Sequence, residues 1–102
     1  SFDAAASRRT PPLTEALDNL AGREVVLDTA GPLVYLGRLD VVDEGGFWLE
    51  DADVHRTDEG HASREQYIVE ARLDGIRANR TRVYVFRHVV TSLSALADVI
   101  TG

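Results

Sequence analysis

Apolar and polar residues alternate most regularly over residues 33–54, and the rest of the chain is organised around this stretch. A run of β-forming residues, LVYLGRLDVV, is followed by the turn sequence DEGG and a second run, FWLEDADV. Two such runs separated by a short Asp/Gly turn predict a β-hairpin. Gly37 interrupts the first run, and a glycine within a strand is typical of a sharp bend or a close backbone approach. A long bent strand leading into a hairpin is what a small barrel needs to close on itself.

Both faces of the first run carry apolar side chains. Alternation places Leu33, Tyr35, Gly37, Leu39 and Val41 on one face. The other face is expected to hold Val34, Leu36, Arg38, Asp40 and Val42. We therefore expect a strand that is shared between two halves of a barrel or that lies at a subunit interface. Trp48, the only tryptophan, is expected to pack in the core or in an interface.

The beginning of the chain predicts an arm, a short helix and a first strand. Residues 1–11 are small, polar and proline-ended, so we expect a flexible N-terminal arm ahead of the folded domain. Beyond it, Leu13, Leu17 and Leu20 share one helical face, with a proline before them and a glycine after them. This pattern predicts a short amphipathic helix. Residues 23–29, REVVLDT, are typical of a strand.

The middle of the chain is ambiguous between helix and strand. The polar residues 55–63 predict a loop. In residues 63–75, SREQYIVEARLDG, apolar positions alternate as they would in a strand. Ser63 followed by Gln66 resembles a capping box, however, and Gly75 is a natural helix stop. We favour the helix.

The last part of the chain again predicts β structure. Residues 81–93, TRVYVFRHVVTSL, are mostly β-branched or aromatic. Arg87 and His88 interrupt this run, which predicts either two strands or one sharply bent strand. Residues 92–101 are expected to close the chain with a short helix.

Composition is that of an ordinary globular protein. A chain of 102 residues can build one hydrophobic core but not two, so we expect residues 12–102 to form a single domain. No apolar run is long enough to span a bilayer, and the first residues lack the hydrophobic stretch of a signal peptide. With no cysteine, a disulfide framework and a thiolate metal site are excluded. We expect a cytoplasmic protein that does not associate with a membrane.

Charge is spread unevenly along an acidic chain. The formal net charge of −6 argues against a protein that coats nucleic acid non-specifically. Residues 40–59 hold eight acids and one arginine, a balance of −7. Residues 77–88 hold four arginines and no acid, a balance of +4. Such a basic strip can bind an anion; the alternative is a row of arginines on a solvated strand face.

The sequence contains no recognisable catalytic or metal-binding pattern. The adjacent carboxylates of Glu50 and Asp51 point to opposite faces of a strand and cannot act as an acid/base pair. There is no phosphate-cradling glycine loop and no nucleotide fingerprint. One stretch carries several candidate metal ligands without a recognised spacing, which favours a solvated acidic loop: Asp53, His55, Asp58, Glu59 and His61. We expect no enzyme activity, no cofactor and no metal.

Residues 20–54 resemble the first motif of the Sm-like family. A helix end is followed by G-x-x-V-x-L, by G-x-L-x-x-h-D and by a hydrophobic third strand. Each part is common alone, but the order and the spacing together are fairly specific. The matching residues are Gly22, Val25, Leu27, Gly37, Leu39, Asp43 and Leu49.

Two registers compete for the second motif of this family. In the first, residues 76–79, IRAN, stand for the I-R-G-N of the LSm proteins, without its glycine. In the second, residues 85–93, VFRHVVTSL, resemble the V-Y-K-H-A-I-S-T-V stretch of the Hfq proteins, with arginine for lysine and the histidine kept. We favour the second register because it matches nine positions without a gap. It leaves residues 55–80 as an insertion between the third and fourth strands.

The resemblance implies a mainly β fold, a small and strongly bent five-stranded β-barrel with an N-terminal α-helix and an inserted helix. Such subunits pair edge strands with their neighbours to form homo-oligomeric rings, and the rings bind single-stranded RNA at their pores. The expected function is therefore RNA binding in RNA metabolism or regulation. The alternative is a ring-forming structural or adaptor module that contacts protein partners instead, suggested by the turn of residues 44–46 and the net charge of −6.

The resemblance also implies which residues would bind RNA. In the family, two loops meet at the pore, and the second motif contributes Arg87 to pair with a phosphate and His88 to bind a base edge or ribose. The alternatives are a salt bridge from Arg87 to an acid of the next subunit and a hydrogen bond from His88 to a carbonyl or carboxylate at a subunit contact. The first motif contributes Asp43 and Glu44, where the family carries a stacking aromatic or an asparagine and this chain has glycines. A further candidate set, for which a solvated turn is the alternative, is Arg77, Asn79 and Arg80.

Overall fold

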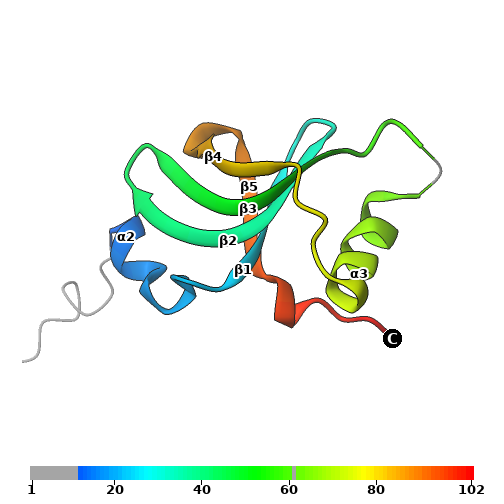
Figure 1. Cartoon of the computed structure of the whole chain (residues 1–102). Helices are drawn as coiled ribbons and strands as arrows, with labels where there is room; N and C mark the ends of the chain where they lie inside the picture. Colours follow the sequence, from blue (N-terminus) through cyan, green and yellow to red (C-terminus); the bar gives the residue numbers. More distant parts are fainter. Residues whose placement is uncertain (1–11, 61) are drawn as a thin grey trace, which may run out of the picture.

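The fold is one strongly bent antiparallel sheet with short helices at its ends (Figure 1). The computed structural model describes residues 12–60 and 62–102, so the arm predicted for residues 1–11 lies outside the described residues. The strands are β1 (Glu24–Thr29), β2 (Leu33–Asp43), β3 (Gly46–Arg56), β4 (Arg80–Phe86) and β5 (Val90–Ala95). They lie in the order β4-β3-β2-β1-β5. The predicted fold class is confirmed, but β4 and β5 are the two edges of the sheet, so hydrogen bonds do not close the barrel.

The predicted hairpin is the pair β2 and β3, and two irregularities bend it. Between the pairs Leu36–Asp53 and Arg38–Glu50 the strand β3 has one extra residue, and Asp51 there has a φ of 49°. Gly37 lies opposite this bulge, where an added Cβ would come within 3.0 Å of the Ala52 Cβ. A bulge of this kind bends a strand, so Gly37 allows the close approach that the bend requires.

A second irregularity changes which side chains face the core. The pairs Leu39–Leu49 and Val42–Phe47 leave one extra residue on β2. The expected alternation of β2 is therefore wrong beyond Leu39. Val42 packs against the core, whereas Val41 is 48% exposed. A bulge inserts one residue and so exchanges the two faces of the strand that follows it.

The sheet buries apolar residues on both of its faces. Inside the bend lies one core of fully or nearly fully buried residues: Val25, Leu27, Leu39, Phe47, Leu49, Ala52 and Val85. On the opposite face a second cluster joins β1 and β2 to the helix α3 (Arg64–Asp74): Val26, Val34, Leu36, Ile68, Ala71 and Leu96. The second apolar face of β2 is thus covered by α3 at Val34 and Leu36, and not by another half of the barrel.

The helix α3 begins and ends where the sequence predicts. The Ser63 side chain accepts from the Gln66 backbone N–H, the Gln66 side chain accepts from the Ser63 N–H, and Gly75 caps the end with a φ of 94°. This confirms the capping box and the helix. Arg64 then ties α3 to the β1–β2 turn, since it pairs with Asp28 and donates to two backbone carbonyl oxygens there.

The remaining helices are shorter than expected. The N-terminal helix predicted over residues 13–20 is split into α2 (Leu13–Ala16) and a 3-10 helix, η1 (Asp18–Leu20). Residues 81–93 form two strands, β4 and β5, joined by a 3-10 helix, η2 (Arg87–Val89). The closing helix expected over residues 92–101 is a continuation of β5 followed by η3 (Leu96–Asp98). None of the helices in the described part of the chain has the length and apolar content needed to cross a bilayer.

Candidate nucleic-acid interface

The β2–β3 turn and η2 lie next to each other at one end of the sheet. β3 pairs with β4 so that Gly46 faces Phe86, which brings the residues that follow Phe86 beside the turn. The backbone N–H of Arg87 donates to the carbonyl oxygen of Gly45, at 2.8 Å. The structure therefore brings Arg87 and His88 together with Asp43 and Glu44, although the two pairs are more than forty residues apart in sequence.

Asp43 shapes the turn through one of its two carboxylate oxygens. Its Oδ1 accepts from the Tyr84 hydroxyl at 2.7 Å and from the backbone N–H groups of Gly45 and Gly46 at 2.9 Å. The hydrogen bond from Tyr84, followed by those from the two backbone groups, holds the pKa of Asp43 below its usual value of 3.8. The same carboxylate raises the pKa of the Tyr84 hydroxyl. Asp43 is therefore a positioning residue.

Arg87 and His88 supply the cationic and hydrogen-bonding groups at this end of the sheet. The Arg87 guanidinium lies 3.3 Å from the Glu44 carboxylate, and both side chains are more than half exposed. An exposed ion pair of this geometry contributes little to stability, roughly 0–1 kcal/mol, so a phosphate can compete for the guanidinium. His88 is exposed as well and lies beside the Phe86 ring.

Gly46 is required by the packing of the turn. A Cβ added there would clash with the Val85 carbonyl oxygen and would lie 3.0 Å from the Tyr84 ring. Gly45 is similarly crowded, because its Cβ would lie 2.8 Å from the Tyr84 hydroxyl. The tyrosine of β4 thus occupies the space that a side chain on the turn would need, which explains physically why the turn carries no aromatic residue of its own.

A row of rings on the outer face of β3 and β4 extends away from this site. We call it the aromatic strip; it consists of Trp48, Tyr84, Phe86 and His88. Consecutive ring centroids are 4.9, 5.2 and 5.9 Å apart. The Arg82 guanidinium lies over the Trp48 ring at 4.1 Å. Of the two predictions for Trp48, core packing is wrong, because its side chain is half-buried on the outer face, and packing in an interface stays a prediction.

The sequence reasoning missed this strip, although a signal was present. Every second residue of a predicted strand carries a ring or a guanidinium, the spacing that places side chains on one face: Arg82, Tyr84, Phe86 and His88.

The basic strip over residues 77–88 is not a single cationic surface. Arg82 pairs with Asp40 at 3.1 Å, as Arg87 does with Glu44.

The structure does not bring Arg77, Asn79 and Arg80 to this site. Arg77 and Asn79 precede β4 and Arg80 begins it, at the far end of the β3–β4 pair, where Ala52 faces Arg80. The Asn79 side chain donates to the Val54 carbonyl oxygen and accepts from the Val54 N–H, both at 3.0 Å. It thereby continues the β3–β4 pairing by one position. Residues 76–79 accordingly precede β4 and do not connect β4 to β5, whereas Arg87 and His88 do.

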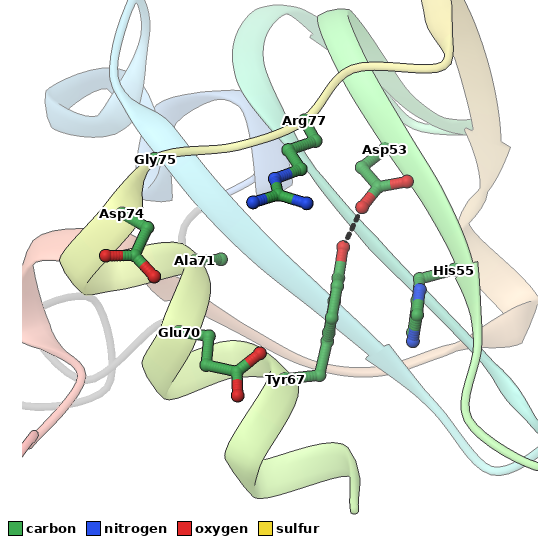
Figure 2. Close-up of a pocket in the computed structure, with 8 residues that line it drawn as sticks. All are labelled: Asp53, His55, Tyr67, Glu70, Ala71, Asp74, Gly75 and Arg77. Atoms are coloured by element: carbon green, nitrogen blue, oxygen red, sulfur yellow. Dashed lines mark hydrogen bonds between the residues drawn. The ribbon is translucent and has the colours of Figure 1, made fainter. Parts of the chain in front are cut away.

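A hollow of about 340 Å³ lies between α3 and β3, far from η2 (Figures 1 and 2). Tyr67 stands in its wall, stacked on His55 at 3.6 Å, and donates a hydrogen bond to the buried Asp53. Burial and this hydrogen bond raise the pKa of the Tyr67 hydroxyl. Figure 2 shows Glu70 and Arg77 beside the same space. Its carboxylates outnumber its one guanidinium, which makes the hollow unsuited to a phosphate chain.

The candidate metal ligands of residues 53–59 all have contacts with other side chains of this chain. Asp53 and His55 are engaged with Tyr67. Arg56 pairs with Asp58 at 2.7 Å and with Glu59 at 3.3 Å. His61 lies outside the described residues.

Comparison with known proteins identifies the fold. No family model and no curated protein matches the chain. The Sm protein of Pyrococcus abyssii, solved in complex with a uridine heptamer, matches with a TM-score of 0.56 and 16% identity over 84% of this chain and 99% of that one. A heptameric archaeal Sm protein matches with a TM-score of 0.53 and 20% identity over 79% and 96%. A Sm-like protein of Pyrobaculum aerophilum matches with a TM-score of 0.53 and 21% identity, over 81% of this chain and 50% of that one.

Proposed function

We propose that this chain, whose fold is Sm-like, assembles into a homo-oligomeric ring and binds single-stranded RNA, in the cytoplasm. One observation carries the RNA-binding part most directly. The hydrogen bond from the Arg87 N–H to the Gly45 carbonyl oxygen holds the β2–β3 turn against η2. It gathers an exposed guanidinium and an exposed imidazole at one end of the sheet, where they can contact phosphate and base.

Assembly is supported by the two edges of the sheet. Among residues 12–60 and 62–102, the strands β4 and β5 each have one neighbour in the sheet, so each offers an edge with which a further strand can pair. Pairing β4 of one subunit with β5 of the next would satisfy both edges, and repetition around a closed circle would leave no edge exposed. Among the similar structures is a heptameric Sm protein, which agrees with this arrangement. The site at η2 lies between these two strands, so a ring would repeat it once per subunit.

RNA is the favoured ligand because the exposed groups at η2 suit a phosphate chain with splayed bases. The similar Sm protein of Pyrococcus abyssii was solved with a uridine heptamer. Because the net charge of −6 repels phosphates, RNA can bind only where accessible arginines make the surface locally positive. Binding is therefore expected to be modest and sensitive to salt.

The direct test is the binding of short labelled U-rich and A-rich RNAs, followed by fluorescence anisotropy at low and physiological salt. The wild-type protein should bind with micromolar or tighter affinity, and Arg87→Ala should weaken binding and reduce its dependence on salt. Arg72→Ala is the matched control, because Arg72 is an exposed arginine on α3, away from η2. If Arg87→Ala binds as the wild type does, the proposed site is wrong.

The alternative is a ring-forming adaptor that contacts protein partners and has lost RNA binding. It is suggested by the ion pair between Arg87 and Glu44, which partly neutralises the guanidinium. Absence of RNA binding at low salt, with an oligomer still formed, would support this alternative.

A further inference from the structure

Within a single chain, the core does not use the outer surface of the aromatic strip. The residues that alternate with it along β3 and β4, among them Phe47, Leu49 and Val85, fill the core. The strip lies on the other side of these strands, and Phe86 is 57% exposed. Trp48 and Tyr84 are half-buried, whereas Phe86 and His88 are exposed. Exposing a large aromatic side chain leaves roughly 2 kcal/mol of burial free energy unused, so a row of rings that ends in an exposed phenylalanine is typical of a binding surface.

The rings of the strip are held in place before any ligand arrives. The Tyr84 hydroxyl is fixed by Asp43, and its ring contacts Trp48 on one side and Phe86 on the other. Arg82 covers Trp48, so the order along the strip is guanidinium, indole, phenol, phenyl and imidazole. Fixed aromatic side chains lose little conformational freedom on binding, which favours affinity.

Arginines flank the rings at both ends. Arg82 lies at one end, and Arg87 lies at the other, next to His88. Their carboxylate partners, Asp40 and Glu44, are exposed and form single ion pairs that a phosphate can displace. Rings that follow one another at 4.9, 5.2 and 5.9 Å in a single row, flanked by arginines, match the alternating bases and phosphates of a single strand.

We propose that the aromatic strip is a base-stacking surface that takes single-stranded RNA from η2 outward along β4, with Phe86 as its principal stacking residue. This inference rests on the proposed function, because the strip is continuous with the η2 site through His88 and Phe86. Stacking on rings tolerates any base, so the strip adds affinity without base preference.

The test is a two-by-two comparison of protein and RNA. Wild-type protein and Phe86→Leu are titrated with a labelled U-rich oligonucleotide and with an oligonucleotide of the same length that is abasic at alternate positions. Phe86→Leu keeps an apolar side chain but removes the ring. It should weaken binding of the intact RNA about five- to 150-fold, the range for one base–aromatic stack. The same substitution should change binding of the abasic RNA less than twofold.

A control variant and a measurement of the oligomeric state distinguish failure of the stacking role from failure of the proposed RNA binding. Leu73→Ala changes another exposed apolar residue, 64% exposed on α3, and should leave both affinities unchanged. An equal loss on both RNAs, or no loss on either, would overturn the stacking role while the Arg87 dependence still stands. A change of oligomeric state in Phe86→Leu would show that the strip is a subunit contact and overturn the proposal. If wild-type protein binds neither RNA, the proposed function itself fails.

Discussion

At the scale of single residues, Tyr84 connects the two parts of the candidate interface. Its hydroxyl donates to Asp43 in the β2–β3 turn, and its ring lies between Trp48 and Phe86 in the aromatic strip. It also occupies the space beside the turn glycine Gly46. The shape of the turn, the protonation of Asp43 and the placement of the rings therefore all depend on this side chain.

Removal of the Tyr84 hydroxyl should raise the pKa of Asp43. Because the hydroxyl stabilises the ionised carboxylate, the pKa of Asp43 in the wild-type protein lies below 3.8, and in Tyr84→Phe it should move up towards that value. A carboxyl whose pKa is depressed by folding stabilises the protein above its unfolded pKa, and this stabilisation is lost as pH falls through the folded pKa. Tyr84→Phe should therefore lose less stability than the wild type on acidification below pH 3.8.

The measurement is an NMR titration of the Asp43 carboxyl, together with urea unfolding at several acidic pH values. Tyr35→Phe is the control, because Tyr35 lies on the core side of the sheet, on a different strand from Tyr84. An unchanged Asp43 titration in Tyr84→Phe would show that the hydrogen bond does not control the turn.

Neutralising Glu44 should strengthen RNA binding. Its carboxylate pairs with Arg87 and also repels phosphate, so Glu44→Gln should lower the dissociation constant about two- to fivefold at low salt. Fluorescence anisotropy measures the dissociation constant. The control variant is Glu65→Gln, which removes the same charge from an exposed residue of α3. Weaker binding by Glu44→Gln would mean that Glu44 itself contacts the RNA.

Residue-level roles could be predicted from sequence only where they depend on local spacing. The proximity of Arg87 and His88 to the turn followed from the motif that carries them. The engagement of Asp43 by Tyr84 could not, because it depends on the pairing of β3 with β4 across forty-one positions. Asn79 lies within residues 76–79, which resemble the I-R-G-N motif, yet its side chain binds the β3 backbone at Val54. This contact also depends on the long-range pairing of β3 with β4.

At the scale of elements, α3 shows how a helix between β3 and β4 is fixed onto the bent sheet. Local signals predict its bounds, since the Ser63–Gln66 capping box and Gly75 act within one turn of the helix. Its position against the outer face of β1 and β2 was not predictable, because it depends on which residues the bent sheet leaves uncovered. The exchange of faces at Val41 and Val42 has a similar origin, in a bulge defined by the partner strand.

Arg64 should be the residue that holds α3 in place most strongly. Its guanidinium pairs with Asp28 and donates to the carbonyl oxygens of Thr29 and Gly31. Arg64→Ala removes these charge-assisted bonds and should lower the free energy of unfolding by about 1–3 kcal/mol. Urea unfolding measures the loss, and hydrogen exchange should show the amides of α3 less protected.

Arg72→Ala provides the matched control for this change. Arg72 is exposed on the same helix, and its substitution should alter stability by less than about 0.5 kcal/mol. Equal effects of the two substitutions would mean that the contacts of Arg64 contribute nothing specific.

At the scale of the whole molecule, the sheet has two free edges and one cationic end between them. The order β4-β3-β2-β1-β5 leaves β4 and β5 outermost, and η2 connects them. A closed ring would pair both edges and repeat the Arg87 and His88 site around its centre, with α3 at the other end of each subunit (Figure 1). Local signals predicted the hairpin and the strands, and the resemblance to the Sm-like family implied the five-stranded fold and its edge pairing. The order of the strands in the sheet depends on long-range pairing and is seen only in the folded chain.

Native mass spectrometry, with and without a U-rich oligonucleotide, tests ring formation and RNA binding in one measurement. We predict a single oligomer whose mass is a whole multiple of 11.2 kDa, a further mass increase by the bound oligonucleotide, and loss of that increase in Arg87→Ala but not in Arg72→Ala. A monomer of 11.2 kDa that gains no oligonucleotide would contradict both the ring and the RNA site.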